Sequence, residues 1–492
     1  MAQGQIKKGF FFYFGLFVLL LISVFFVCLV IMMFNPGQTL LWMKYFTGNE
    51  KFLVSKTTDT QTTIDWANVG SLKINCGYAK VSVQRNSEFN EDGLYIINEA
   101  KGFAGAKSVA EFDYNVYYEG NALVVDIVEP NGFLFLSKNI EVILHATVEG
   151  STNFQNLKLE VNTTDGDIDL GGTRWNQGEE VRLSSIKASS TKGDVCINEK
   201  MNTSSLTAFS LSSNEGKLYS LKEITYDGSK TGKGFTANCD VTLKTIKGEI
   251  SYDAISAGAS EVSIDCKKGS FSADWVSVSS LNVRCVQGNY KIGKVYGNLD
   301  FENSEDTIIA PNIVVDYVSG NFDLSTNDTN IQAEPDIDIG EVGGTVFVLA
   351  DRGTVNIMKA DGRIDILGEK SLAVDIKVAE SNSQDKSIII NSGSIRIGFL
   401  GEVSGSTLLE SKAGKIVVNV TSVASFTSNA FLNDLEGTTR VDGSKIFVSH
   451  GLIEGETKNP LQVRGSSASS GSMQIKTNST INYNLVDKAD LE

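Results

Sequence analysis

A short unit recurs along most of this chain: a polar residue, Gly, another polar residue, then apolar, polar and apolar residues. Residues 165–170 (DGDIDL), 192–197 (KGDVCI) and 247–252 (KGEISY) are three copies. Apolar residues at every second position place one side of an extended segment inward and the other toward water, which is the pattern of a β-strand. Glycine supplies the positive φ that tight corners between strands require. The unit therefore predicts short strands joined by glycine-containing corners.

Successive copies lie roughly 20 residues apart, with shorter steps of about half that length, and such periods are typical of solenoids. One coil cannot bury its apolar edge alone, but stacked coils share a continuous interior. The chain has 46 Gly and only 5 Pro, which suits regular strands and tight turns. We therefore expect an all-β domain folded as a parallel β-helix (β-solenoid). Its predicted corner glycines are Gly166, Gly193, Gly248, Gly269, Gly288, Gly297, Gly320, Gly343, Gly353, Gly362, Gly393 and Gly414.

The beginning of the chain has a different composition. From Gly9 to Phe34 there is no charged residue, and Phe, Leu, Val and Ile dominate. A helix over this run would be ~39 Å long at ~1.5 Å per residue, which is enough to cross a hydrocarbon core of ~30 Å. A cleaved secretory signal would have a shorter apolar core of ~7–15 residues that ends at small residues. The run therefore favours one uncleaved transmembrane helix that acts as a signal anchor.

The residues around this run predict its orientation. Lys7 and Lys8 precede it, and the positive-inside tendency places such residues in the cytoplasm. Trp42 and Tyr45 follow it and are typical of an interfacial aromatic belt. We therefore expect a single-pass protein of the cell membrane with its C-terminal domain outside the cytoplasm. The expected segments are a cytoplasmic N-terminus (1–8), the transmembrane helix (9–34), a juxtamembrane stalk (35–65), an N-terminal β region or cap (66–160), solenoid repeats (161–480) and a C-terminal tail (481–492).

Charge and cysteine content narrow the choice of partners. The formal net charge is −16, and there is no block of basic residues, so a nucleic acid is not an expected partner. Cys266 and Cys285 each lie three residues before a repeat glycine and should occupy equivalent places in neighbouring coils. A stack of buried thiols is the favoured interpretation, and a disulfide between them is the alternative.

Candidate chemistry is sparse. Asp165, Asp167 and Asp169 alternate across Gly166 and could form an exposed strip of carboxylates for calcium, although a solvated strand face is the favoured interpretation. The chain has two histidines, His145 and His450, far apart in sequence. We predict no catalytic residues, no cofactor and no metal beyond this calcium hypothesis.

The sequence resembles a known family over roughly residues 66–420. Residues 132–144 (GFLFLSKNIEVIL) and 157–170 (LKLEVNTTDGDIDL), followed by further Gly-Asp or Gly-Asn units, carry the resemblance. The chain is similar here to the bacterial "putative adhesin" family of β-helical cell-envelope proteins. This resemblance implies surface exposure in a bacterium and an adhesive or scaffolding role, and it supplies no catalytic residues.

Three functions follow as hypotheses. The preferred one is a membrane-anchored binding or scaffolding module of the cell envelope, with a protein or glycan partner at the cell surface. The second is a structural subunit that self-associates into a surface filament or layer. The third is a polysaccharide-active enzyme, because some β-helices carry carboxylate-based active sites; we predict that the chain is not an enzyme.

Overall fold

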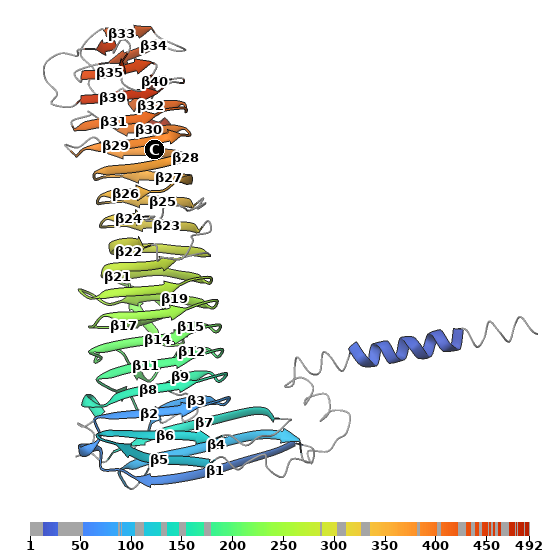
Figure 1. Cartoon of the computed structure of the whole chain (residues 1–492). Coiled ribbons are helices and arrows are strands. Elements are labelled where there is room, and N and C mark those ends of the chain that lie inside the picture. Colours follow the sequence, from blue (N-terminus) through green and yellow to red (C-terminus); the bar gives the residue numbers. More distant parts are fainter. Residues whose placement is uncertain are drawn as a thin grey trace, which may run out of the picture.

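The computed structural model describes residues 13–27, 53–86, 89, 91–103, 113–128, 135–146, 154–171, 179–285, 288–302, 311–325, 335–380, 384–400 and 405–421, and short segments between residues 430 and 491. The described chain is almost entirely β, and most of its strands stack into one elongated column (Figure 1). Each strand segment of a coil pairs in parallel with the equivalent segments of the coils before and after it. The predicted β-solenoid is confirmed.

The coils have up to three sides, which we name the first, second and third faces in chain order. The first face contains β2 (Ser71–Cys76), β8 (Lys158–Thr163), β11 (Ser185–Ser190), β14 (Ala208–Ser213), β18 (Val241–Thr245), β20 (Glu261–Cys266), β24 (Phe322–Ser325), β26 (Val346–Leu349), β29 (Lys386–Ser392), β31 (Ser406–Ser411) and β39 (Ser472–Thr477). The second face contains β3 (Lys80–Arg85), β9 (Ile168–Leu170), β12 (Val195–Ile197), β15 (Leu218–Ser220) and β40 (Ile481–Val486).

The third face begins with β10 (Val181–Arg182) and β13 (Met201–Asn202), followed by the end of β17 (Lys230–Thr236). An antiparallel hairpin of β16 (Glu223–Tyr226) and β17 enlarges this coil. In later coils the strands are longer and continue around corners, so one strand serves two faces. These strands are β19 (Glu249–Ser256), β21 (Ser270–Cys285), β22 (Asn289–Glu302), β23 (Asn312–Val318), β25 (Asp336–Val342), β27 (Arg352–Ala360), β28 (Ile364–Glu380), β30 (Ile395–Leu400) and β32 (Ile416–Thr421).

Apolar side chains alternate inward on each face, as the sequence pattern predicts. In β8, Leu159 and Val161 are buried while Lys158 is exposed. Buried side chains from the cap to the last described coils belong to a single cluster. Because full burial of one Val, Leu or Ile side chain contributes about 1.5–3 kcal/mol, each coil becomes stable only when a neighbour covers it.

The first corner joins the first face to the second, and a buried hydroxyl group closes it. The hydroxyl of Ser213 donates to the carbonyl oxygen of Gly193 in the preceding coil at 2.7 Å and accepts from the N–H of Gly216 at 2.9 Å. Ser190 makes the equivalent bond to the N–H of Gly193 at 2.8 Å, and Thr245 occupies the same place two coils later. The repeated turn is therefore Ser, Thr or Cys, then two residues, then Gly, and its hydroxyl satisfies backbone groups that would otherwise be buried without partners.

Glycine is required at these corners because successive coils touch there. A Cβ on Gly193 would overlap the carbonyl group of Gly166 in the coil below, and a Cβ on Gly248 would overlap that of Gly216. The predicted corner glycines lie in two columns rather than one. Gly166, Gly193, Gly248, Gly269, Gly288, Gly353, Gly393 and Gly414 lie at the first corner, and Gly297, Gly320, Gly343 and Gly362 lie at the third corner, which joins the third face to the first.

Cys266 occupies the place of the corner hydroxyl in β20. Its register partner in the next coil is Cys285, as the sequence predicts, but the side chain of Cys285 lies outside the described part of the chain. Cys266 is a free, buried thiol, and burial raises its pKa to about 12. A small buried thiol thus replaces the hydroxyl in this coil.

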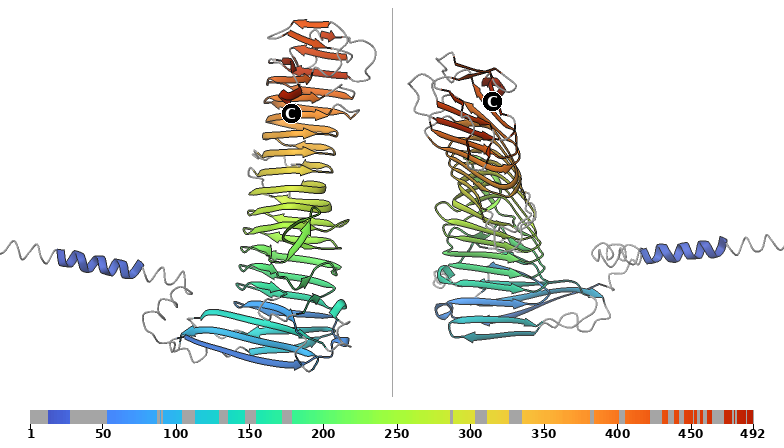
Figure 2. Two further views of the ribbon diagram at one scale, coloured as in Figure 1. Left: turned by 180° about the vertical axis from the view of Figure 1, so that it is seen from behind. Right: turned by 45° about the horizontal axis from the view of Figure 1, so that its top comes forward.

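Antiparallel sheets close the N-terminal end of the column, and they form its broad base in Figures 1 and 2. The first coil, β2 and β3, lies between β8 and β9 on one side and β6 (Ala122–Val128) and β7 (Phe135–His145) on the other. The pairs β1–β4, β4–β7 and β5–β6 are antiparallel, with β1 (Leu53–Thr63), β4 (Gly93–Phe103) and β5 (Asp113–Glu119). Thus β1, which lies within the segment expected to be a stalk, belongs to these sheets.

The C-terminal strands extend the column. β39 stacks on β31 and β40 on β32, so residues 481–486, which we expected in a tail, form a solenoid strand. The short helix α3 (Lys488–Leu491) then buries Leu491 beside Gly398. Beyond β39, β35 (Lys445–His450) continues the first face. The remaining described strands are β33 (Ala430–Asn433), β34 (Thr438–Val441), β36 (Leu452–Ile453), β37 (Glu456–Thr457) and β38 (Leu461–Val463).

Residues 13–27 form a helix with exposed side chains, drawn in dark blue in Figure 1. Across the described residues, we find no helix that combines the length and the apolar character needed to cross a bilayer. Gly9, Phe34, Trp42 and Tyr45, which the sequence assigns to the membrane anchor and its interfacial belt, lie outside the described residues.

Candidate functional site

The three carboxylates considered for calcium have separate partners. Asp165 forms an ion pair of 3.1 Å with a lysine of the next coil. Asp167 accepts a hydrogen bond from the backbone N–H of Asp194 at 2.9 Å, and buried Asp169 accepts one from Nδ2 of Asn198 at 2.7 Å. Within the described ranges, no three His, Cys, Asp or Glu side chains are grouped in a way that could hold a metal ion.

The residue after a corner glycine has a structural role. Asp194 repeats the contact of Asp167 and accepts from the N–H of Lys217 in the next coil at 2.7 Å. At the third corner, Oδ1 of Asn298 accepts from the N–H of Asn321 at 2.9 Å. The Asp or Asn of the repeated unit therefore links one coil to the next by a hydrogen bond. Its carbonyl or carboxylate oxygen accepts that bond from a backbone N–H of the neighbouring coil.

A groove runs along the outside of the first corner. Its volume is about 510 Å³, and its charged lining consists of Glu215, Lys217, Lys247, Glu249 and Lys268. Lys217 and Glu249 form an ion pair at 2.6 Å, and Lys247 lies 3.8 Å from Glu215. The hydrogen bond that Lys217 donates to Glu249 raises the pKa of Lys217. Most of the charge in this groove is therefore compensated between neighbouring coils.

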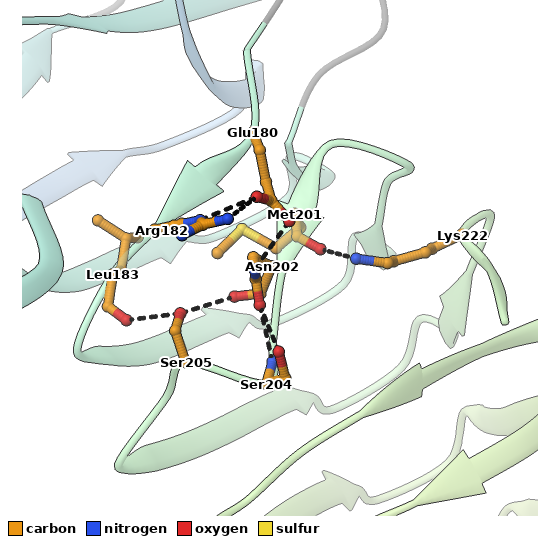
Figure 3. Close-up of polar contacts among 8 residues, drawn as sticks. All are labelled: Glu180, Arg182, Leu183, Met201, Asn202, Ser204, Ser205 and Lys222. Carbon is orange, nitrogen blue, oxygen red and sulfur yellow. Dashed lines mark hydrogen bonds and ion pairs between the residues drawn. The ribbon is translucent and has the colours of Figure 1, made fainter. Parts of the chain in front are cut away.

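A polar cluster occupies the N-terminal end of the third face (Figure 3). Glu180 accepts from Nε of Arg182 at 2.8 Å and from Nδ2 of Asn202 at 2.7 Å. Lys222, at the base of the β16–β17 hairpin, donates to the carbonyl oxygen of Met201 at 2.5 Å, and burial lowers the pKa of Lys222. These groups are hydrogen-bond partners of one another, so the cluster joins the hairpin to the coils below it.

Four aromatic rings continue the third face beyond this cluster. Tyr226, Trp275, Tyr296 and Tyr317, which we call the aromatic stripe, are all half-buried. Their ring centroids are 5.6 Å apart from Tyr226 to Trp275, 5.8 Å from Trp275 to Tyr296 and 5.8 Å from Tyr296 to Tyr317. Neighbouring rings are tilted by 39° to 55°. The stripe is therefore a continuous, partly exposed run of rings parallel to the column axis.

Three successive strands and the hairpin position these rings. Trp275 of β21, Lys294 of β22 and Tyr317 of β23 are register partners across three coils. Tyr296 lies two residues after Lys294, on the same outward side of β22, and its ring lies between those of Trp275 and Tyr317. The hairpin contributes Tyr226 at the end of β16. Strand alternation thus directs the rings outward at steps of about 4.8 Å per coil.

Several polar groups along the stripe have no partners within the described chain. The phenol hydroxyls of its three tyrosines make no hydrogen bond there, and the exposed side chains of Asp274, Lys294 and Asp316 make no ion pair. Nε1 of Trp275 is buried without an acceptor, so packing fixes this ring. The stripe thus differs from the corners, because it combines apolar rings with free donors and acceptors.

The charges beyond the stripe are paired again. Nζ of Lys359 lies 2.8 Å from Glu341, 3.0 Å from Asp361 and 3.9 Å from Glu380. The hydrogen bonds that Lys359 donates to Glu341 and Asp361 raise the pKa of Lys359. This network links neighbouring coils across the third face. The part of that face on which polar side chains of the stripe have no partner in the described chain ends here.

Our sequence analysis missed the stripe. Trp275, Tyr296 and Tyr317 recur at intervals of about one coil, and aromatic residues at outward positions of the repeat would have been a usable signal. Tyr226 could not have been found in this way because it comes from an inserted hairpin. His145, in contrast, is buried in the N-terminal cap, where its Nδ1 lies 2.5 Å from the carbonyl oxygen of Glu91. His450 ends β35, and its side chain is not among those described.

No protein-family model and no curated protein matches the chain. Solved structures do show similarity, and they include the following two. One is a "putative cell adhesion protein" from Clostridium sporogenes, at 9% identity over 64% of this chain and 100% of that chain. The other is a "putative adhesin" from Parabacteroides merdae, at 14% identity over 74% of this chain and 96% of that chain. The TM-score is 0.18 for each, and at this value neither similarity assigns a fold or a function to the chain.

Proposed function

We propose that the protein is a membrane-anchored, extracytoplasmic β-solenoid that acts as an adhesin-like binding or scaffolding module of the cell envelope. The aromatic stripe is the observation that carries this proposal. Partly exposed aromatic residues beside unpaired polar groups are typical of binding surfaces. A column of stacked coils presents such a surface at fixed geometry, without loss of conformational entropy in flexible loops.

Membrane anchoring is supported by the uncharged run from Gly9 to Phe34, of which residues 13–27 are helical. A fractionation experiment on cells that make the full chain tests this part. The chain should remain with membranes after extraction at alkaline pH, and protease added outside the cytoplasmic membrane should cleave the solenoid. Release into the soluble fraction, or protection of the solenoid, would contradict the proposed anchor and orientation.

Binding is tested with the full chain reconstituted in lipid vesicles. Vesicles that carry the protein should bind bacterial cells or isolated envelope material in a saturable way, and protein-free vesicles should not. Absence of saturable binding to cells, glycans and envelope proteins would overturn the function. Growth of ordered assemblies with protein concentration, without binding to other material, would favour the filament or layer subunit instead.

A further inference from the structure

We propose that the aromatic stripe is a docking platform for one extended chain of an uncharged polysaccharide, which lies along the column axis. This inference rests on the proposed surface-binding function and names the chemistry of its ligand. The stripe is long and narrow, and its rings follow one another at 5.6 Å to 5.8 Å. A regular row of this kind fits a ligand that is itself a regular linear polymer.

The chemistry of the stripe fits a carbohydrate. A sugar ring has patches of C–H groups, whose slight positive charge is attracted to the electron-rich faces of aromatic rings. Its hydroxyl groups both donate and accept hydrogen bonds. The free hydroxyls of Tyr226, Tyr296 and Tyr317 and the exposed side chains of Asp274 and Lys294 offer both kinds of partner along the row.

Charge favours an uncharged polymer. Asp274 and Asp316 flank Lys294, so the stripe has charges of both signs. The chain as a whole carries −16, and this field would repel nucleic acids and polyanionic glycans. A polycation would be attracted equally to other acidic parts of the surface and would gain little from the rings.

Shape favours a glycan over a proline-rich peptide. Proline-rich segments dock in aromatic-lined grooves, where pockets between rings hold the proline side chains. The groove described above lies at the first corner, and its charged lining is Glu215, Lys217, Lys247, Glu249 and Lys268. The stripe lies on the third face, where strands of consecutive coils form a regular ladder. Such a surface suits the C–H faces of sugar rings.

The experiment uses the full chain in detergent micelles. Its binding is measured to an array of neutral, acidic and amino-sugar polysaccharides, to neutral gluco-oligosaccharides of increasing length, and to a proline-rich peptide. We expect binding to a neutral polysaccharide, with an affinity that increases with oligosaccharide length until the ligand covers the stripe. Tyr296→Leu and Tyr317→Leu should each weaken this binding by about tenfold or more, because they remove an aromatic face and keep an apolar side chain.

Two control variants separate stacking from folding. Tyr296→Phe keeps the ring and should retain most of the affinity. Tyr118→Leu removes an aromatic side chain on β5 that is 55% exposed, far from the stripe, and should bind like the unmodified protein. Circular dichroism and the unfolding midpoint of each variant show whether it is folded.

Three results would overturn the inference: no glycan binds, glycan binding is unchanged in both leucine variants, or the proline-rich peptide is the ligand that the stripe variants lose. If the leucine variants still bind cells as well as the unmodified protein does, only the stripe is excluded and the surface-binding function stands. If the unmodified protein binds neither cells nor glycans, both proposals fail.

Discussion

The first corner and the third face of this solenoid use polar residues in opposite ways. At the first corner, the hydroxyl of Ser213 satisfies backbone groups of two coils, and Asp167 and Asp194 each bond to the coil above. On the third face, the tyrosine hydroxyls and the charged groups beside the stripe have no partner in the described chain. The most repetitive residues of the sequence therefore serve stacking, whereas the less repetitive ones form the surface proposed for binding.

The two regions should also differ in how they respond to substitution. Changes at the first corner remove contacts that each coil needs, so they should lower the free energy of unfolding and leave the chemistry of the third face unchanged. Changes in the stripe should alter the chemistry of the third face and leave the free energy of unfolding unchanged.

Gly193→Val should have the largest effect. A Cβ at this place would overlap the backbone of Gly166 in the coil below. We therefore expect the free energy of unfolding to fall by about 3 kcal/mol or more. Hydrogen exchange of the β11 and β14 amides would show the local loss of protection. Gly258→Ala is the control, because Gly258 has a φ of +58° and open space around it. This substitution should lower the free energy of unfolding by only about 1–2 kcal/mol, because alanine is strained in the left-handed backbone conformation. Equal losses in the two variants would contradict the stacking argument.

Ser213→Ala should cost about 2 kcal/mol. The substitution leaves the N–H of Gly216 and the carbonyl oxygen of Gly193 buried without the hydroxyl that now bonds to both. Chemical denaturation of the purified chain measures the change. Ser213→Thr should restore most of the stability, since Thr245 makes the same bond to its own glycine at 2.8 Å. If Ala and Thr are equally stable at this position, the hydroxyl does not support the corner.

Asp194→Ala should cost about 1 kcal/mol, because it removes the acceptor for the N–H of Lys217 in the next coil. Asp194→Asn keeps an acceptor oxygen, as Asn298 does at the third corner, and should be within a few tenths of a kcal/mol of the unmodified protein. The unfolding midpoint in urea measures both. A loss in the Asn variant as large as in the Ala variant would indicate that charge, and not the hydrogen bond, is what matters.

Lys359→Met should have the smallest effect, about 0.5 kcal/mol, although Lys359 contacts three carboxylates. The side chain of Lys359 is 37% exposed, and water and salt screen ion pairs at such sites. The difference between the variant and the unmodified protein should shrink further as the salt concentration in the denaturation experiment increases. A large effect that does not depend on salt would mean that this part of the third face, like the first corner, depends on its polar contacts.

The sequence allowed the prediction of the coil but not of its full geometry. Alternation in residues such as Leu159 and Val161 and the regular corner glycines follow local rules, so strands and corners were predictable. The division of the glycines into two columns was not predictable. It depends on where Gly297 and Gly320 lie relative to the third face, and the repeated unit does not indicate that face. The placement of β2 between β6 and β8 was also beyond reach, since it depends on pairing between segments far apart in the chain.

The candidate site was less predictable still. Asp167 and Asp169 stood out because they alternate along a strand, yet both serve the stack. The rings of the stripe come from separate coils and meet only because Trp275 and Tyr317 share a register with Lys294. Trp275, Tyr296 and Tyr317 are evenly spaced in sequence, but the register that aligns them depends on the length of each coil.

Side-chain footprinting with hydroxyl radicals tests the division between corner and third face most directly. The full chain is oxidised with and without the neutral polysaccharide proposed as its ligand, and the modified side chains are located by mass spectrometry. Tyr296 and Tyr317 should become protected when the ligand is present, whereas Tyr78, which is 63% exposed between β2 and β3, should be oxidised equally in both samples. Protection of Tyr78 and the first corner, with no change at Tyr296 and Tyr317, would contradict the assignment of binding to the third face.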